Sequence, residues 1–289
     1  MENELRRPAE ELICKYNLEP DLRDIFVEGD LDEYLLNWMI SEKNISHLKV
    51  YNIETIDIPK NTIPKPWSGN KGRVIALSNL FMSELIDVDN VRCIVDKDFD
   101  QMTGCIITSK YLLYSDFANM EMYTFNDLCL KKLFESGLRK KFTADIFSGL
   151  SKVLQEVFII RLVKELKYKN KTWVKLDRCC EYDKDSGEIN FNTKSYVSRL
   201  TGFLETSEEV DQFLKDTQEQ KKHLNVDCRQ QIHGHDYISI LVWLAKQIGV
   251  KANLCNKESI SSILWTSLLI DDFLSNSLLQ NIITFSSQE

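Results

Sequence analysis

Short apolar runs alternate with helical patterns through the first 130 residues, and this alternation restricts the fold more than any other feature of the chain. The runs have the length of buried strands and cover residues 23–28, 48–53, 91–95 and 111–115. Apolar residues at helical spacing lie around them, at residues 3–17, 30–41, 71–85 and 119–134. Such alternation predicts an α/β fold with a mostly parallel sheet flanked by helices.

The remaining residues have a different pattern, which predicts a mainly helical region. Helical spacing of apolar residues continues through residues 141–167, 206–221, 235–248 and 258–282. Two short strands are expected at residues 171–176 and 188–192, around the turn at residues 183–187. We therefore expect an α/β domain at residues 1–130. A mainly helical region with a small β-hairpin, serving substrate binding or dimerisation, is expected at residues 131–289.

Acidic residues follow two of the expected strands directly. Glu28 ends the first strand, and Asp96, Asp98 and Asp100 follow the third. The carboxyl ends of parallel strands gather at one edge of a sheet, where ligand sites form. Carboxylates held close together repel one another, and a hard divalent cation compensates their charge. The pattern predicts a site for Mg²⁺ or Mn²⁺, with a nearby Glu able to move a proton.

Five further residues are candidates for a second metal or for groups that support the first. They are Asp32, Asp116, Glu121, His235 and Asp236. Asp116 and Glu121 equally fit a polar helix start, and the Gly-His-Asp sequence at residues 234–236 equally fits a helix N-cap. We also expect Asp30 to cap the helix at residues 30–41, with Glu33 completing a capping box.

Basic residues are concentrated in one segment of an acidic chain. The formal net charge is −8. Residues 131–175 nevertheless contain 12 Lys and Arg against 4 Asp and Glu. Basic residues beside a glycine turn or within this segment are candidates for phosphate contacts. They are Lys71, Arg73, Lys131, Lys132 and Lys140. A solvated helix face explains the basic segment equally well.

The eight cysteines and the apolar runs bear on the compartment of the protein. The cysteines form no CxxC pair and no zinc-ligand spacing, so we expect reduced thiols. The charged start MENELRRPAEE has no apolar signal region, and no apolar run approaches the roughly 20 residues that cross a bilayer. We expect a cytoplasmic protein without a membrane segment.

Three sequence motifs together resemble the Toprim family of topoisomerases, primases and overcoming-lysogenization-defect nucleases. They are IFVEG at residues 25–29, GNKGRVIAL at 69–77 and IVDKDFD at 94–100. The resemblance covers roughly residues 20–130. It implies that Glu28, Asp96 and Asp98 are the catalytic and metal-binding residues, with Asp100 extending the acidic run.

A narrower resemblance involves SDFANMEMY at residues 115–123 and the Gly-His-Asp motif. With these segments the layout is similar to the Toprim effector subunits of PARIS anti-phage defence systems. That resemblance implies a toxin-like nuclease that cuts host tRNA and an ABC-type ATPase partner that restrains it. We expect a homodimer when the enzyme is active, with the apolar helix at 141–167 or residues 265–273 as candidate surfaces.

Several alternatives remain open on the sequence alone. A DNA nuclease of the overcoming-lysogenization-defect type would use the same residues. A non-catalytic Toprim-like binding module would not need all three acidic residues. A haloacid-dehalogenase-like phosphatase usually has Thr where this chain has Asp100. A topoisomerase needs a nucleophilic Tyr, and none stands out.

Overall fold

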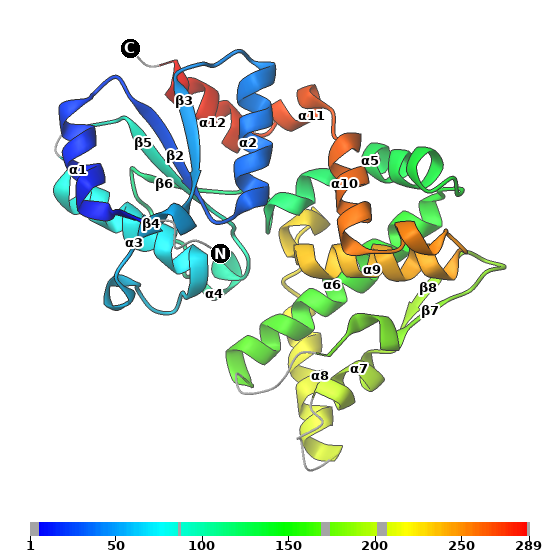
Figure 1. Cartoon of the computed structure of the whole chain (residues 1–289). Coiled ribbons are helices and arrows are strands. Elements are labelled where there is room, and N and C mark those ends of the chain that lie inside the picture. Colours follow the sequence, from blue (N-terminus) through cyan, green and yellow to red (C-terminus); the bar gives the residue numbers. More distant parts are fainter. Residues whose placement is uncertain (1–5, 86–87, 169–173, 201–206, 288–289) are drawn as a thin grey trace. The chain divides into compact units, whose positions relative to one another are not determined.

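The computed structural model describes residues 6–85, 88–168, 174–200 and 207–287. The chain divides into two compact units (Figure 1). The first unit consists of residues 1–116 and 269–289, and the second consists of residues 117–268. The expected boundary at residue 130 therefore lies inside the second unit, and the last residues of the chain belong to the first.

The first unit is built on a four-stranded parallel sheet, so the expected α/β fold with flanking helices is confirmed. The strand order is β3-β2-β5-β6, and every neighbouring pair is parallel. The elements of this unit are β1 (Arg7–Pro8), α1 (Ala9–Leu18), β2 (Arg23–Val27), α2 (Asp30–Glu42), β3 (Leu48–Asn52), β4 (Ile56–Asp57), α3 (Gly69–Glu84), β5 (Val91–Val95), α4 (Asp100–Thr103), β6 (Leu112–Tyr114), α11 (Ile270–Leu274) and α12 (Ser277–Ser286). β1 and β4 pair separately in a short parallel ladder.

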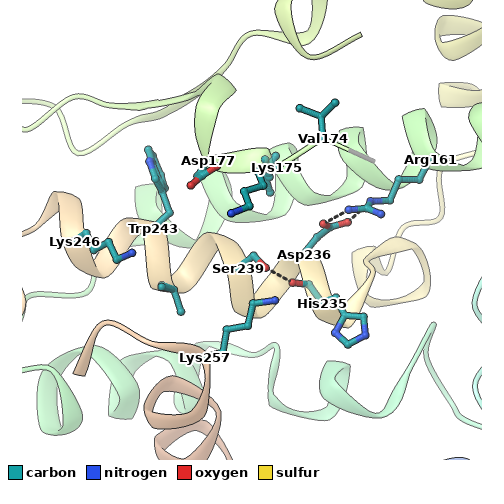
Figure 2. A pocket seen from close by; sticks show the side chains of 12 residues that line it. Arg161, Val174, Lys175, Asp177, His235, Asp236, Ser239, Trp243, Lys246 and Lys257 are labelled. Atoms are coloured by element: carbon teal, nitrogen blue, oxygen red, sulfur yellow. Dashed lines mark hydrogen bonds and ion pairs between the residues drawn. The ribbon is translucent and has the colours of Figure 1, made fainter. Parts of the chain in front are cut away.

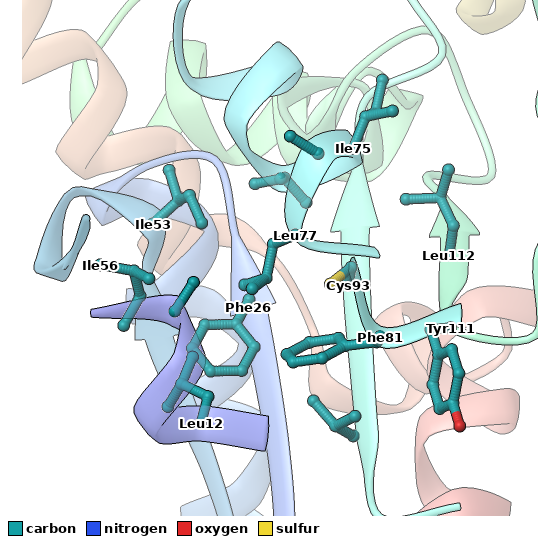
Figure 3. Packing of buried hydrophobic residues seen from close by; sticks show 14 of the residues in the cluster. Leu12, Phe26, Ile53, Ile56, Ile75, Leu77, Phe81, Cys93, Tyr111 and Leu112 are labelled. Atoms are coloured by element: carbon teal, nitrogen blue, oxygen red, sulfur yellow. The ribbon is translucent and has the colours of Figure 1, made fainter. Parts of the chain in front are cut away.

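One face of the sheet packs against α1 and α3. Every second residue of a strand points to the same face, so Phe26 of β2 and Cys93 of β5 turn toward this core. Phe81 of α3 packs against the ring of Phe26 (Figure 3). The ring of Tyr16, on α1, also contacts Phe81. This cluster buries the face of β2 that carries Phe26, and the burial of all five residues of the strand requires cover on the other face as well.

The opposite face is covered by residues from the end of the chain. The guanidinium of Arg92, on β5, lies 4.4 Å from the ring centroid of Phe285 on α12, and that of Arg23 lies 5.8 Å away. The carboxylate of Asp116 accepts hydrogen bonds from the backbone N–H of Leu278, at 3.0 and 3.2 Å. These contacts explain why residues 269–289 join the first unit.

The strand order reverses between β2 and β5. The chain leaves β2 through α2 to β3 on one side, and then returns through α3 to β5 on the other side of β2. Right-handed crossovers in opposite directions place α2 and α3 on opposite faces. The carboxyl ends of β2 and β5 therefore flank a topological switch point, the usual ligand crevice of such sheets.

The second unit is mainly helical. Its elements are α5 (Asp127–Lys131), α6 (Ala144–Lys167), β7 (Cys180–Tyr182), β8 (Ile189–Phe191), α7 (Thr193–Leu200), α8 (Ser207–Lys221), α9 (Gly234–Gln247) and α10 (Lys257–Ser267). The long helix α6 packs against α8, α9 and β8, and α10 packs against α9. Gly149 of α6 allows β8 to approach closely, because an added Cβ would lie 3.1 Å from Ile189.

Three expectations within this half of the chain were wrong in detail. The first strand of the hairpin is β7, at residues 180–182, because strands that flank a turn at 183–187 must lie next to it. Of the expected strand at 171–176, residues 171–173 lie outside the described part, and Leu176 begins a 3₁₀ turn. The helices expected at 119–134 and 258–282 are each broken into shorter segments.

No helix in the described part of the chain is long and apolar enough to cross a membrane. All eight cysteines are free thiols, and most of them are buried.

The cap on α12 yields the first prediction. Asp116→Ala removes the acceptor for Leu278 N–H and the negative charge at the start of the helix, so we expect the free energy of unfolding to fall by about 1–2 kcal/mol. Urea denaturation measures this. Asp211→Ala, on the exposed side of α8, is the control and should change stability by less than about 0.5 kcal/mol. Equal effects of both substitutions would contradict the capping role.

Candidate functional site

A direct hydrogen bond joins the two acidic motifs at the switch point. Glu28 follows the last residue of β2, and Asp96 follows the last residue of β5. The backbone N–H of Asp96 donates to Oε1 of Glu28 at 2.8 Å. The parallel pairing of β2 and β5 brings these residues together although they are 68 positions apart in the sequence. The expected meeting of the two motifs at one sheet edge is therefore present.

Glu28 is held in an environment that disfavours its charge. Burial is the main cause that raises the pKa of Glu28, to about 8. The hydrogen bond from Asp96 N–H opposes this shift, as does the charge of Lys71, whereas the charges of Asp98 and Asp32 add to it. A carboxyl group with a pKa near neutrality can both accept and donate a proton at physiological pH.

Lys71 lies between two of the acidic residues that the sequence assigns to a metal. Its Nζ lies 3.0 Å from Oδ2 of Asp98 and 2.9 Å from Oδ2 of Asp100. Lys71 is buried in the first turn of α3, where both desolvation and the helix dipole disfavour a cation. The two carboxylates outweigh the desolvation and raise the pKa of Lys71. Lys71 is thus the countercharge of the acidic run.

Trp67 holds the carboxylate of Asp100 from the other side. Its indole Nε1 donates to Oδ2 of Asp100 at 2.9 Å. Gly72 makes this arrangement possible, because a Cβ at that position would lie 2.6 Å from Ile63 and 3.2 Å from the backbone of Trp67. Lys71 and Trp67 therefore hold the carboxylate of Asp100 between them. The side chain of Asp98, in contrast, is about one-third exposed.

The backbone of the second motif is also constrained. Asp98 has a φ of 45°, in the left-handed region that Asp tolerates better than most residues. The N–H of Lys97 donates to Oγ of Ser115 at 3.2 Å, and its Nζ donates to the carbonyl of Asp116 at 2.6 Å. These bonds tie the loop after β5 to the end of β6.

The N-cap of the helix that follows Glu28 lies one residue earlier than expected. Gly29 is the N-cap of α2, and Oδ2 of Asp32 accepts its backbone N–H at 3.2 Å. The expected pair of Asp30 and Glu33 was therefore wrong. Oδ1 of Asp30 instead accepts the side-chain amide of Asn52 at 2.6 Å. Asp32 thus stabilises the helix start and adds negative charge beside Glu28.

Asn70 is a site residue that the sequence did not reveal. Its side-chain amide donates to the carbonyl of Glu28 at 2.8 Å and to Glu54 at 3.0 Å. The one feature of the sequence that could have indicated this role is the position of Asn70 directly after the glycine turn. The neighbouring Arg73 donates to the carbonyls of Ile53 and Ile56, so its guanidinium supports the loop after β3.

The other candidate residues lie apart from this group in the fold. Asp116 caps α12 within the first unit. Glu121, His235, Asp236, Lys131, Lys132 and Lys140 all belong to the second unit. There, Gly234 lies against the carboxylate of Glu121, and Lys132 donates to the carbonyl of Ser267 at 3.2 Å.

The carboxylates supply hard oxygen ligands, which are the donors that Mg²⁺ prefers. Among the described residues, however, no three His, Cys, Asp or Glu side chains form a group that could hold a metal ion. Lys71 provides the positive charge for Asp98 and Asp100 in this arrangement. Glu28, Asp96 and Asp98 offer carboxyl oxygens of the kind that Mg²⁺ prefers, but the raised pKa keeps Glu28 largely protonated near neutral pH, so a bound cation would have to displace that proton.

No protein-family model matches the chain, and no curated protein matches it in sequence. The fold and the site define a parallel α/β unit whose acidic residues meet at a topological switch point.

The raised pKa of Glu28 yields the second prediction. The folded protein retains a proton that the unfolded chain releases above its ordinary pKa of 4.5. The free energy of unfolding therefore falls as the pH rises from about 4.5 to about 8. Glu28→Gln removes this loss and keeps an acceptor for Asp96 N–H. In metal-free buffer we expect the variant to be more stable than the natural protein by roughly 1–3 kcal/mol at pH 8.5 and nearly equal to it at pH 5.

Chemical denaturation at the two pH values measures the difference. Glu42→Gln, at the exposed end of α2, is the matched control and should show no pH-dependent gain. A Glu28→Gln variant that is destabilised at both pH values would show that its carboxylate is well compensated in the fold.

Proposed function

We propose that the chain is a magnesium-dependent nuclease whose reaction centre is the carboxyl edge of β2 and β5. The observation that carries this proposal is the hydrogen bond from Asp96 N–H to Glu28 at the switch point, beside the Asp98–Lys71–Asp100 cluster. A proton-transferring carboxyl, further carboxylates and a buried ammonium group lie together there. This combination suits chemistry on a phosphodiester, whose charge and leaving group both require stabilisation.

Glu28, Asp96 and Asp98 are the residues that would hold the metal ion. When bound, Mg²⁺ would stabilise charge on the phosphate and lower the pKa of a water molecule. Asp98 is the accessible acid of the run, whereas Asp100 is held by Trp67 and Lys71. We therefore assign Asp100 the task of positioning Lys71.

Glu28 and Lys71 are the residues of the chain that would act on the substrate. Glu28 would move the proton, since its pKa is raised toward neutrality and its position is fixed by Asp96 N–H. Lys71 would balance the negative charge that a phosphate adds to the acidic site. Asn70 would hold the backbone of Glu28 in place through its carbonyl.

The resemblance to Toprim effectors of defence systems supports a finer proposal. On that basis the enzyme cleaves host tRNA in the cytoplasm, acts as a homodimer and is restrained by an ABC-type ATPase partner. The basic segment at residues 131–175 would contribute phosphate contacts of its own. DNA cleavage of the overcoming-lysogenization-defect type uses the same centre and is distinguished only by the substrate.

One observation favours a second candidate function, a non-catalytic phosphate-binding module. Lys71 already compensates Asp98 and Asp100, and the carboxylates do not converge as a ready ligand group in the described residues. In such a module the acidic run would orient Lys71, and no bond would be cleaved.

Cleavage assays separate these functions. The purified protein is incubated with bulk tRNA, single-stranded DNA and duplex DNA, in Mg²⁺ and in chelator. We expect metal-dependent cutting of tRNA that falls at least about 100-fold in Glu28→Gln and in Asp96→Asn, because the first removes the proton-transferring carboxyl and the second removes a carboxylate that would hold the metal.

Glu42→Gln and Asp211→Asn are exposed controls of the same chemistry and should cut like the natural protein. Preferential cutting of DNA would favour the alternative substrate. Undiminished cutting by both site variants would reject the reaction centre, and binding without cutting would support the module.

Metal binding can be tested without activity. Lys71→Met leaves Asp98 and Asp100 uncompensated, so we expect it to lower the free energy of unfolding by about 3 kcal/mol. A divalent cation at these residues should then raise the melting temperature of Lys71→Met more than that of the natural protein. Lys71→Arg, which keeps the charge, and Lys49→Met, on the exposed side of β3, should respond to Mg²⁺ like the natural protein. Equal shifts in all four proteins would contradict a metal site at this cluster.

A further inference from the structure

The second unit contains a cavity of about 540 Å³ that the proposed nuclease centre does not use (Figure 2). Residues from α6, from the segment before β7, from α9 and from the start of α10 line it. Its volume lies within the range of small-molecule sites in proteins. Because four separate segments form the walls, the packing of these segments determines the shape of the cavity.

Positive charge dominates the lining. Lys175, Lys246 and Lys257 come from three different segments, and all three are exposed. In the part of the chain that the structure describes, no acidic residue forms an ion pair with any of them. Three lysines around one cavity repel one another, and an anionic ligand would compensate them.

The remaining charged groups of the cavity include an ion pair between Arg161 and Asp236. Nε of Arg161 lies 2.5 Å from Oδ2 of Asp236, and its Nη2 donates to Oδ1 at the same distance. Asp236 is buried, so this bidentate pair forms a fixed wall of the cavity. The other acid, Asp177, is exposed and would accept hydrogen bonds from a ligand hydroxyl or amino group.

An apolar wall faces part of the same space. Val174, Leu176, Val242 and Trp243 contribute to the lining. Figure 2 shows Trp243 and Lys246 on α9, with Lys175 and Asp177 on the neighbouring segment. A ligand that fills this cavity therefore combines an anionic end with a flat or apolar part.

The Gly-His-Asp motif at the start of α9 belongs to this cavity. Gly234 leaves room for the side chain of Glu121, since an added Cβ would lie 2.3 Å from its carboxylate. The two following residues, His235 and Asp236, line the cavity. Ser239 donates to the carbonyl of His235 at 2.6 Å, which fixes the first turn of the helix. The motif thus builds a ligand pocket.

We propose that this cavity binds a nucleotide, with the phosphate on Lys175, Lys246 and Lys257 and the base against the wall that includes Trp243. The nucleotide is either free in solution or the terminal unit of a nucleic-acid strand, since both present the same phosphate and base. Asp177 accepts from the sugar hydroxyls or the base. This inference stands independently of the nuclease activity, and its test uses no metal.

Calorimetric titration of the full chain with AMP and ATP, in chelator, tests the proposal. We expect saturable binding with one site per chain that weakens as salt is added. The exposed double variant Lys246→Ala/Lys257→Ala should bind ATP at least about tenfold more weakly, because two charge-assisted contacts are lost. Lys152→Ala/Lys184→Ala removes the same charge at exposed positions elsewhere in this unit, and it should change affinity by less than about twofold.

Competition identifies the source of the nucleotide. A 5′-phosphorylated single-stranded RNA that displaces ATP more tightly than AMP does would assign the pocket to a strand end, and weaker displacement would assign it to a free nucleotide. The proposal is overturned if neither AMP nor ATP saturates the protein, if both double variants lose affinity equally, or if inorganic phosphate binds as tightly as AMP.

Discussion

The parallel pairing of β2 with β5 is the constraint on which the rest of the first unit depends. This pairing brings Glu28 within hydrogen-bonding distance of Asp96 N–H, and it concentrates negative charge at the edge where the strand order reverses. A concentration of carboxylates in a partly buried place costs free energy unless a cation compensates it. Lys71 provides that compensation from the first turn of α3.

The surrounding structure can be understood as support for this compensated cluster. The glycine at position 72 lets the segment containing Trp67 fold against α3, and Trp67 then fixes Asp100. Asn70 fixes the backbone after β2. Part of the cost of burying these acids remains at Glu28, whose pKa stays raised mainly because the side chain is buried.

The sequence predicted the parts of the fold that local pattern determines. The bounds of β5 were predicted to the residue, and β2 and α2 to within one, because their apolar patterns are strong. The sequence could not predict that residues 269–289 pack in the first unit. The hydrogen bonds from Leu278 to Asp116 span 162 positions, and such a contact leaves no periodic pattern in the sequence. The meeting of Glu28 with Asp96 followed from parallel topology. The roles of Lys71, Trp67 and Asn70 depend on side-chain directions that spacing does not encode.

The capping of α12 by Asp116 also has a consequence for synthesis. A ribosome releases residues 117–268 after β6 and before the helix that covers the second face of the sheet. Arg23 and Arg92 therefore gain their contact with Phe285 only after the second unit has been synthesised.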